Sequence, residues 1–208
     1  MKKGTAVVKQ GAWGICGFVC VLNGLNQRGG FKMWGKDLTA AKIDAHIGPE
    51  IIGYLKQTEA DKPALAKKIV DFTVSFGAPY SSFNTITKLC DEIAKHVRAG
   101  TPDKVPGFGV ALPMEAVVDY VTNHVGFKCT TFTKNEEITP TSLAAYKDTI
   151  VGVGGAKTLE HWVYVDKAGV LMNWSNAFKL GDKTEGPAGV EQLKSQDLKN
   201  IICGVKLA

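Results

Sequence analysis

The spacing of apolar residues changes once along the 208-residue chain, close to residue 126. Before that point, apolar side chains recur at helical spacing through residues 36–100 and again through residues 113–124. After it come short apolar or alternating runs that are typical of strands, at 127–132, 149–153, 162–165, 170–172 and 201–205, with a short helix expected at 141–146. The sequence therefore predicts an α+β fold in a single domain, residues 1–208, with a helical half of about 10–125 and a strand-rich half of about 126–206.

Glycine and proline divide the helical half. Breaks are expected near Gly48-Pro49, near Lys62-Pro63 and near residues 77–79, because proline disfavours helical backbone in the residue before it. A separate short helix is expected at residues 17–25, where it follows the first cysteine and ends at a glycine-containing turn.

The composition is that of an ordinary soluble domain, with 45% hydrophobic and 22% charged residues. The net charge of +5 is spread over scattered lysines, so nothing indicates a nucleic-acid partner. No apolar run approaches the roughly 20 residues that a membrane span requires, and the start of the chain lacks the features of a signal peptide. We expect cytoplasmic synthesis, with export only by a route that needs no signal peptide.

The chain contains five cysteines, an odd number, and none of them forms a Cys-x-x-Cys unit. Neither a zinc ribbon nor a thioredoxin motif is indicated, and the sequence implies no metal or organic cofactor. Cys20, Cys90, Cys129 and Cys203 are interpreted as small buried hydrophobic residues in a reduced compartment. An alternative role for Cys20, one helical turn after Cys16, is that of a resolving thiol in a redox protein.

Cys16 is the strongest candidate for a nucleophile, because it opens the helix expected at residues 17–25. The dipole and the unpaired amides of a helix N-terminus, together with a facing imidazole, are expected to acidify its thiol. Gln10 precedes it by six residues and offers a side-chain amide that can donate a hydrogen bond to an oxyanion. Gly14 and Gly17 let the backbone lie close to a substrate.

His161 heads an apolar strand and is the candidate base. A third group usually holds the imidazole of such a pair, and the strand that returns across a tight turn at 167–169 brings Asn173 back to the level of His161. Asn176 and Asp166 are rival candidates for this third position. Trp13 and Trp174 are expected either to line the cleft between the two halves or to belong to the core.

These residues resemble the papain-like cysteine peptidases, closest to the bacteriocin-leader-processing (double-glycine peptidase) branch and related bacterial effector hydrolases. The match covers Gln10 with Cys16-Gly17, residues 161–165, and the order of elements between them. The resemblance implies a papain-like fold, in which a helical half with the cysteine helix packs on an antiparallel sheet that carries the histidine. The chain departs from that branch in its longer helical region at residues 30–100 and in Asn173-Trp174, where the branch commonly has aspartate and proline.

From these parts we expect a thiol hydrolase that cleaves an amide bond through a thioester, with Cys16, His161, Asn173 and Gln10 as its catalytic group. The substrate would be a peptide, a protein or a peptidoglycan-type molecule, and the resemblance adds the reading of a bacterial effector or toxin. The same residues would also serve a glutamine deamidase or transglutaminase. Another alternative is a papain-like binding module without catalysis, and the oligomeric state is left open.

Overall fold

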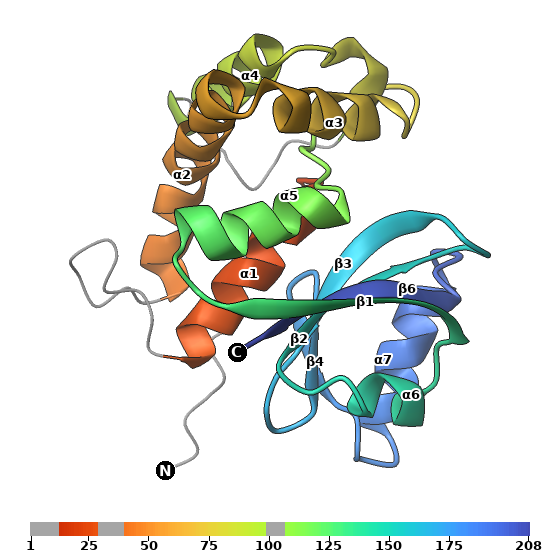
Figure 1. Ribbon diagram of the computed structural model, residues 1–208. Coiled ribbons are helices and arrows are strands. Elements are labelled where there is room, and N and C mark those ends of the chain that lie inside the picture. Colours follow the sequence, from red (N-terminus) through yellow and green to blue (C-terminus); the bar gives the residue numbers. More distant parts are fainter. Residues whose placement is uncertain (1–12, 29–39, 99–106) are drawn as a thin grey trace.

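The computed structural model describes residues 13–28, 40–98 and 107–208. Its elements confirm the α+β class (Figure 1). In chain order the helices of the first part are α1 (Cys16–Gln27), α2 (Ala40–Asp61), α3 (Pro63–Val74), the 3-10 helix η2 (Tyr80–Ser82), α4 (Ile86–Arg98), α5 (Met114–Asp119) and the π-helical turn η3 (Tyr120–His124). They are followed by β1 (Cys129–Glu137), α6 (Pro140–Ala144), β2 (Thr149–Gly154), β3 (Leu159–Val165), β4 (Val170–Asn173), β5 (Asn176–Lys179), α7 (Glu185–Lys194) and β6 (Asn200–Leu207).

The six strands form one antiparallel sheet in the order β1-β6-β2-β3-β4-β5. Side chains alternate across β3: Trp162 and Tyr164 belong to the larger apolar cluster with α1 and α5, whereas Val163 and Val165 belong to a second cluster with α6 and α7. The sheet is therefore covered on both faces, which explains why β2 is buried along its whole length.

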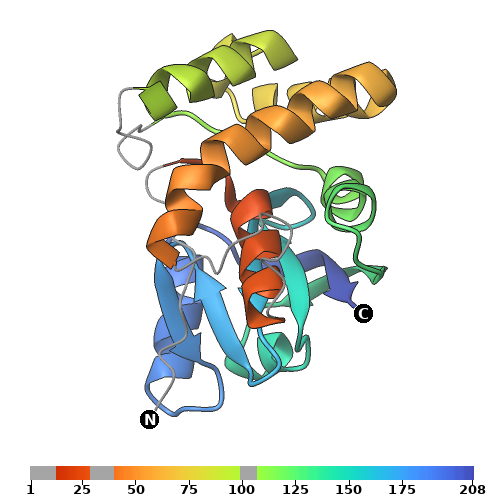
Figure 2. The ribbon, with the colours of Figure 1, turned by 90° about the vertical axis from the view of Figure 1, so that its left-hand side faces the viewer.

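Helix α1 lies against β3 at the centre of the molecule (Figure 2). Every residue from Gly17 to Leu25 is buried, because the helix packs against the sheet on one side and against the other helices elsewhere. A helix that is apolar around its whole circumference is stable only in such a position. Its first residue, Cys16, is thereby fixed at one end of the sheet.

Helices α2, α3 and α4 with η2, residues 40–98, form what we call the helical lobe, which projects beyond the sheet at the top of Figure 1. The predicted break at Lys62-Pro63 is confirmed, since Pro63 is the first residue of α3, where a missing N–H leaves no bond unmade. The helices also stop before residues 77–79, as predicted. The break predicted at Gly48-Pro49 is wrong: α2 continues through Pro49. The parts of this prediction at residues 36–39 and 99–100 lie outside the described residues.

Two elements of the strand-rich half were not predicted, namely β5 and α7. Both lie beside β4, where β5 pairs with β4 and α7 packs against β5. In the described part of the chain, no helix combines the length and the apolar character that crossing a bilayer requires.

Candidate active site

A cleft of about 450 Å³ opens where the start of α1, the end of α3 and one end of the sheet meet. Cys16 and His161, far apart in sequence, both line it. Its remaining walls come from aromatic and apolar residues (Trp13, Phe76, Tyr80, Ala111, Trp174 and Leu198) and from Gly14, Glu160 and Gln196, and polar and apolar groups face the cleft in similar amounts. A concave site in which convergent polar groups lie among apolar walls is the usual form of a ligand site. Of the two alternatives for Trp13 and Trp174, both hold in part: both residues line the cleft, Trp13 also belongs to the larger core cluster, and Trp174 packs against the second cluster.

The chain that leads into Cys16 is held by a short parallel bridge between Gly14 and Gly109. The Gly14 N–H donates to the Phe108 carbonyl at 2.8 Å, and the Val110 N–H donates to the Gly14 carbonyl at 3.0 Å. A Cβ at Gly109 would lie only 2.7 Å from the Gly14 Cα, so this approach requires glycine. The bridge fixes the start of α1 and therefore the position of Cys16, the first residue of that helix.

His161 stands next to a β-bulge at the start of β3. Val153 pairs with His161 and Gly154 pairs with Leu159, which leaves Glu160 as an extra residue without a partner in β2. Such bulges bend a strand and redirect its side chains. As a result, the consecutive residues Glu160 and His161 both line the cleft, although residues in a regular strand alternate between faces.

The His161 ring is held on two sides. Its Nε2–H donates to Oδ1 of Asn173 at 2.7 Å, and the Trp174 ring stacks on it with centroids 4.9 Å apart and planes inclined by 26°. Asn173 is only 2% exposed. Since Nε2 is bonded to Asn173, Nδ1 is the ring nitrogen that can accept a proton.

The backbone N–H groups of Trp162, Gly17 and Cys16 itself lie close enough to the Cys16 sulfur to favour its thiolate. The thiol therefore lies beside the residue that directly follows His161. Burial nevertheless raises the pKa of the Cys16 thiol to about 11, against the lowering effect of these amides. The prediction that the helix start lowers the pKa of the Cys16 thiol is therefore wrong, because desolvation raises this pKa by more than the amides at the helix start lower it.

Burial also lowers the pKa of His161 to about 4, against the opposing effect of its hydrogen bond to Asn173. At neutral pH the two groups are thus a thiol and a neutral imidazole. A neutral imidazole whose Nδ1 is unprotonated can act as a base.

The rival third residues occupy other roles. Asp166 is buried, and its Oδ1 accepts the N–H groups of Ala168 and Val170, so it holds the tight turn between β3 and β4. Asn176 is exposed at the start of β5. Gln10 lies outside the described residues. Cys20 is buried one turn beyond Cys16, and all five cysteines are free thiols.

Sequence reasoning missed Gln192 on α7. Its Oε1 accepts a hydrogen bond from Nδ2 of Asn173 at 3.1 Å, which extends the chain of contacts from His161 through Asn173. Only a predicted helix at residues 185–194 could have pointed to Gln192, and the sequence analysis did not predict that helix.

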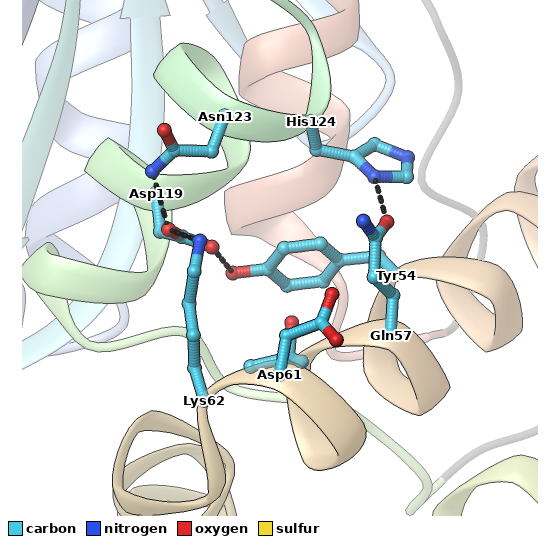
Figure 3. A pocket seen from close by; sticks show the side chains of 8 residues that line it. Tyr54, Gln57, Asp61, Lys62, Asp119, Asn123 and His124 are labelled. Carbon is cyan, nitrogen blue, oxygen red and sulfur yellow. Dashed lines mark hydrogen bonds and ion pairs between the residues drawn. The ribbon is translucent and has the colours of Figure 1, made fainter.

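A second pocket lies between α2 and the α5–η3 segment (Figure 3). Its free volume is about 20 Å³, about enough for one water molecule and too small for a substrate. Asp119 at its centre binds Lys62 Nζ, the Asn123 amide and the Tyr54 hydroxyl. These groups satisfy one another, so the pocket is a structural contact between the helical lobe and the rest of the chain.

The cleft around Cys16 and His161 is therefore the candidate active site. Comparison of the chain with protein-family models, with curated proteins and with solved structures finds no match.

Proposed function

We propose that this protein is a papain-like thiol hydrolase that cleaves an amide bond through a thioester intermediate. One observation carries the proposal: a cysteine at a helix start and a histidine held by an asparagine line the same cleft. A nucleophile, a base and a group that orients the base are the three parts that covalent acyl transfer requires.

In the first half of the reaction, Nδ1 of His161 takes the thiol proton as Cys16 Sγ attacks the carbonyl carbon of the substrate. The carbonyl electron pair moves to the oxygen, which the Cys16 backbone N–H and the Gln10 side-chain amide stabilise. The C–N bond then breaks, and the His161 imidazolium gives its proton to the leaving amine. The product of this half is a thioester on Cys16.

In the second half, His161 removes a proton from water as the water oxygen attacks the thioester carbonyl. The C–S bond breaks, the carboxylic acid leaves, and the imidazolium returns its proton to the Cys16 sulfur. Attack by an amine in place of water would give transamidation, and a glutamine side chain as substrate would give deamidation.

The lining of the cleft favours a peptide substrate with a bulky apolar side chain close to the scissile bond. Phe76 and Tyr80 line the cleft from the helical lobe, and Trp174 lines it from the turn between β4 and β5. Among the described lining residues, Glu160 is the one carboxylate, and none is Lys or Arg. A substrate that is dense in carboxylates, such as a peptidoglycan stem, would find no complementary charge on these walls.

The test is covalent labelling of the full-length protein at pH 7 with a peptide vinyl sulfone that carries phenylalanine next to the reactive group. Peptide mass spectrometry then gives the rate at each of the five cysteines. We expect Cys16 to react at least about tenfold faster than Cys129, the other half-buried thiol, and His161→Ala to slow Cys16 alone. Cys129→Ala is the matched control and should label normally.

A non-catalytic binding module is the second candidate, and one observation favours it. With the thiol pKa near 11 and the imidazole pKa near 4, the free protein holds no thiolate at neutral pH. If Cys16 reacts no faster than Cys129, and His161→Ala changes nothing, the hydrolase proposal fails and the binding module remains.

A further inference from the structure

The two ends of the Asn173 side-chain amide are both bonded, and in opposite senses. Oδ1 accepts from Nε2–H of His161 at 2.7 Å, while Nδ2 donates to Oε1 of Gln192 at 3.1 Å. The amide is 2% exposed, so water does not compete for either end.

The orientation of this amide decides which ring nitrogen of His161 carries the proton. With Oδ1 toward the ring, Nε2 must be the donor, and Nδ1 keeps the lone pair that accepts the thiol proton in the proposed reaction. A half-turn of the amide would place Nδ2 toward the ring, so Nε2 would have to accept and Nδ1 would carry the hydrogen. In that tautomer His161 has no lone pair for Cys16.

Shape alone does not distinguish these two orientations, because the oxygen and the NH₂ group of an amide are nearly equal in size. The choice is made by the hydrogen-bonding partner at the far end. In this structure Gln192 presents its carbonyl oxygen there, and with the Gln192 amide in this orientation Nδ2 lies at that end and Oδ1 at the imidazole.

The position of Gln192 is itself fixed by close packing of α7. A Cβ at Gly189, one turn before it, would lie 2.9 Å from the Phe178 side chain, so α7 and β5 are in close contact at this point. Val190 and Leu193, on either side of Gln192 in sequence, are buried in the cluster beneath the sheet. The helix thus holds the Gln192 side chain beside Asn173 without any contact of its own with the cleft.

We propose that Gln192 is a positioning residue of the active site, which acts through Asn173 to select the Nε2–H tautomer of His161. This inference rests on the proposed function for its purpose, since the tautomer matters only if Nδ1 takes a proton. The selection itself is a property of the resting protein and can be measured without a substrate.

Three substitutions separate hydrogen bonding from packing. Gln192→Glu offers only acceptors, Gln192→Met fills a similar volume and offers neither donor nor strong acceptor, and Gln192→Lys offers only donors. Glu191→Met, on the neighbouring exposed position of α7, is the matched control for a change of the helix.

The first readout is the tautomer of His161 in ¹⁵N-labelled full-length protein at pH 7, from two-bond ¹H–¹⁵N correlations assigned with a His161→Gln variant. We expect the Nε2–H form in the wild type, in Gln192→Glu and in the Glu191→Met control. Gln192→Met should show a mixture, and Gln192→Lys should show mainly Nδ1–H.

The second readout is the rate at which Cys16 reacts with the peptide vinyl sulfone. It should fall by about tenfold or more in Gln192→Lys and less in Gln192→Met, with recovery in Gln192→Glu. Circular dichroism and the unfolding midpoint of each variant show whether the fold is kept.

A variant that keeps the fold separates the outcomes. The Nε2–H tautomer in both Gln192→Met and Gln192→Lys would overturn the role of Gln192, whatever the labelling rates are. A tautomer that follows position 192 in a protein whose Cys16 does not label would support the positioning role and overturn the proposed function instead.

Discussion

The Cys16–His161 pair is held neutral by burial, which raises the pKa of the thiol to about 11 and lowers that of the imidazole to about 4. A thiolate–imidazolium pair in this cleft would have to form in the presence of the substrate, when the developing negative charge moves on to the carbonyl oxygen. The backbone N–H of Trp162, which lies close to the sulfur, would stabilise the charge during that transfer. The asparagine partner helps in the same direction, since its hydrogen bond raises the pKa of His161.

The lowered pKa of His161 predicts that acid destabilises the fold through this residue. In the unfolded chain the imidazole gains a proton below its ordinary pKa of 6.5, whereas the folded protein gains it only near pH 4. Stability is therefore fully present above pH 6.5 and is lost as the pH falls from 6.5 to about 4. Between pH 7 and 4.5 the free energy of unfolding should fall by about 2 kcal/mol more in the wild type than in His161→Gln, as measured by urea denaturation. Equal losses in the two proteins would contradict the buried neutral state.

The close approach of Gly14 and Gly109 predicts that Gly109→Ala damages the site. The new Cβ would lie 2.7 Å from both the Cα and the carbonyl oxygen of Gly14, so the bridge must open and the start of α1 must shift. We expect a loss of about 2 kcal/mol in unfolding free energy and at least about tenfold slower labelling of Cys16. Gly53→Ala is the control: its Cβ would meet nothing within 4 Å, and alanine in mid-helix should stabilise by about 0.5–1 kcal/mol.

The sequence predicts the helices and strands whose apolar residues form a clear pattern without reference to the rest of the fold. Helix α1 and the buried strands β2 and β3 lie where the apolar runs indicate. Helix α7 escapes prediction because its ten residues include Gly186, Pro187 and Gly189 and bury little except Val190 and Leu193. Strand β5 has four residues and no buried one, so only its pairing with β4 makes it a strand.

The difference between local pattern and tertiary packing also decides which residues of the candidate site the sequence could indicate. Cys16, His161 and Asn173 could be named as candidates because each stands in a recognisable local pattern: a helix start, a strand head and the return of a hairpin. Gln192 could not, since its role comes from α7 packing on β5, and Pro49 inside α2 shows the opposite case, in which tertiary packing overrides a local signal.

The segment that follows α3 supplies a wall of the cleft, which predicts an effect of Phe76 on substrate preference. Phe76 is 37% exposed, the one large hydrophobic side chain so exposed in the described part of the chain, and it contacts Tyr80 edge-on with centroids 6.1 Å apart. Phe76→Ala should lower kcat/KM by about tenfold for peptides with a bulky apolar side chain and change alanine-containing peptides little. Phe72, one turn earlier and outside the cleft, packs edge-on against Phe76 with ring centroids 5.3 Å apart, so Phe72→Ala should show a smaller effect of the same kind. A uniform loss across all peptides would mean that Phe76 supports the fold and not the substrate.

On the scale of the whole molecule, the cleft depends on how the helical lobe is attached to the sheet. The contact runs from α2 to the α5–η3 segment (Figure 3). Tyr120 donates to Glu50 at 2.9 Å, and Tyr54 donates to the Ala116 carbonyl at 3.1 Å. Burial is the largest cause that raises the pKa of the Tyr54 and Tyr120 hydroxyls, and the nearby carboxylates raise it further. Both hydroxyls therefore stay protonated and can donate. Because the lobe carries Phe76 and Tyr80, this polar contact sets one wall of the cleft from a distance.

Removal of the central carboxylate should therefore loosen the lobe before it unfolds the protein. In Asp119→Ala the Lys62 ammonium loses its ion-pair partner and the Asn123 amide loses an acceptor, while the Tyr54 hydroxyl keeps the Ala116 carbonyl as its acceptor. Lys62 is 40% exposed and can turn to water, so we expect a loss of about 2–3 kcal/mol in unfolding free energy, less than for a fully buried pair. Hydrogen exchange should quicken in α2 and α5 and remain slow in β2 and β6, and KM for an apolar peptide should rise more than kcat falls.

Asp71→Ala is the matched control, because it also removes an aspartate that is paired with a lysine in the helical lobe. The Lys67–Asp71 pair is exposed, with 74% and 59% of the two side chains accessible, and should contribute less than about 0.5 kcal/mol. If Asp119→Ala behaves like Asp71→Ala, the α2–α5 contact does not hold the lobe. If it instead quickens exchange equally in the helices and in the sheet, the lobe and the sheet unfold as one unit, and the cleft wall cannot move separately from the strand that carries His161.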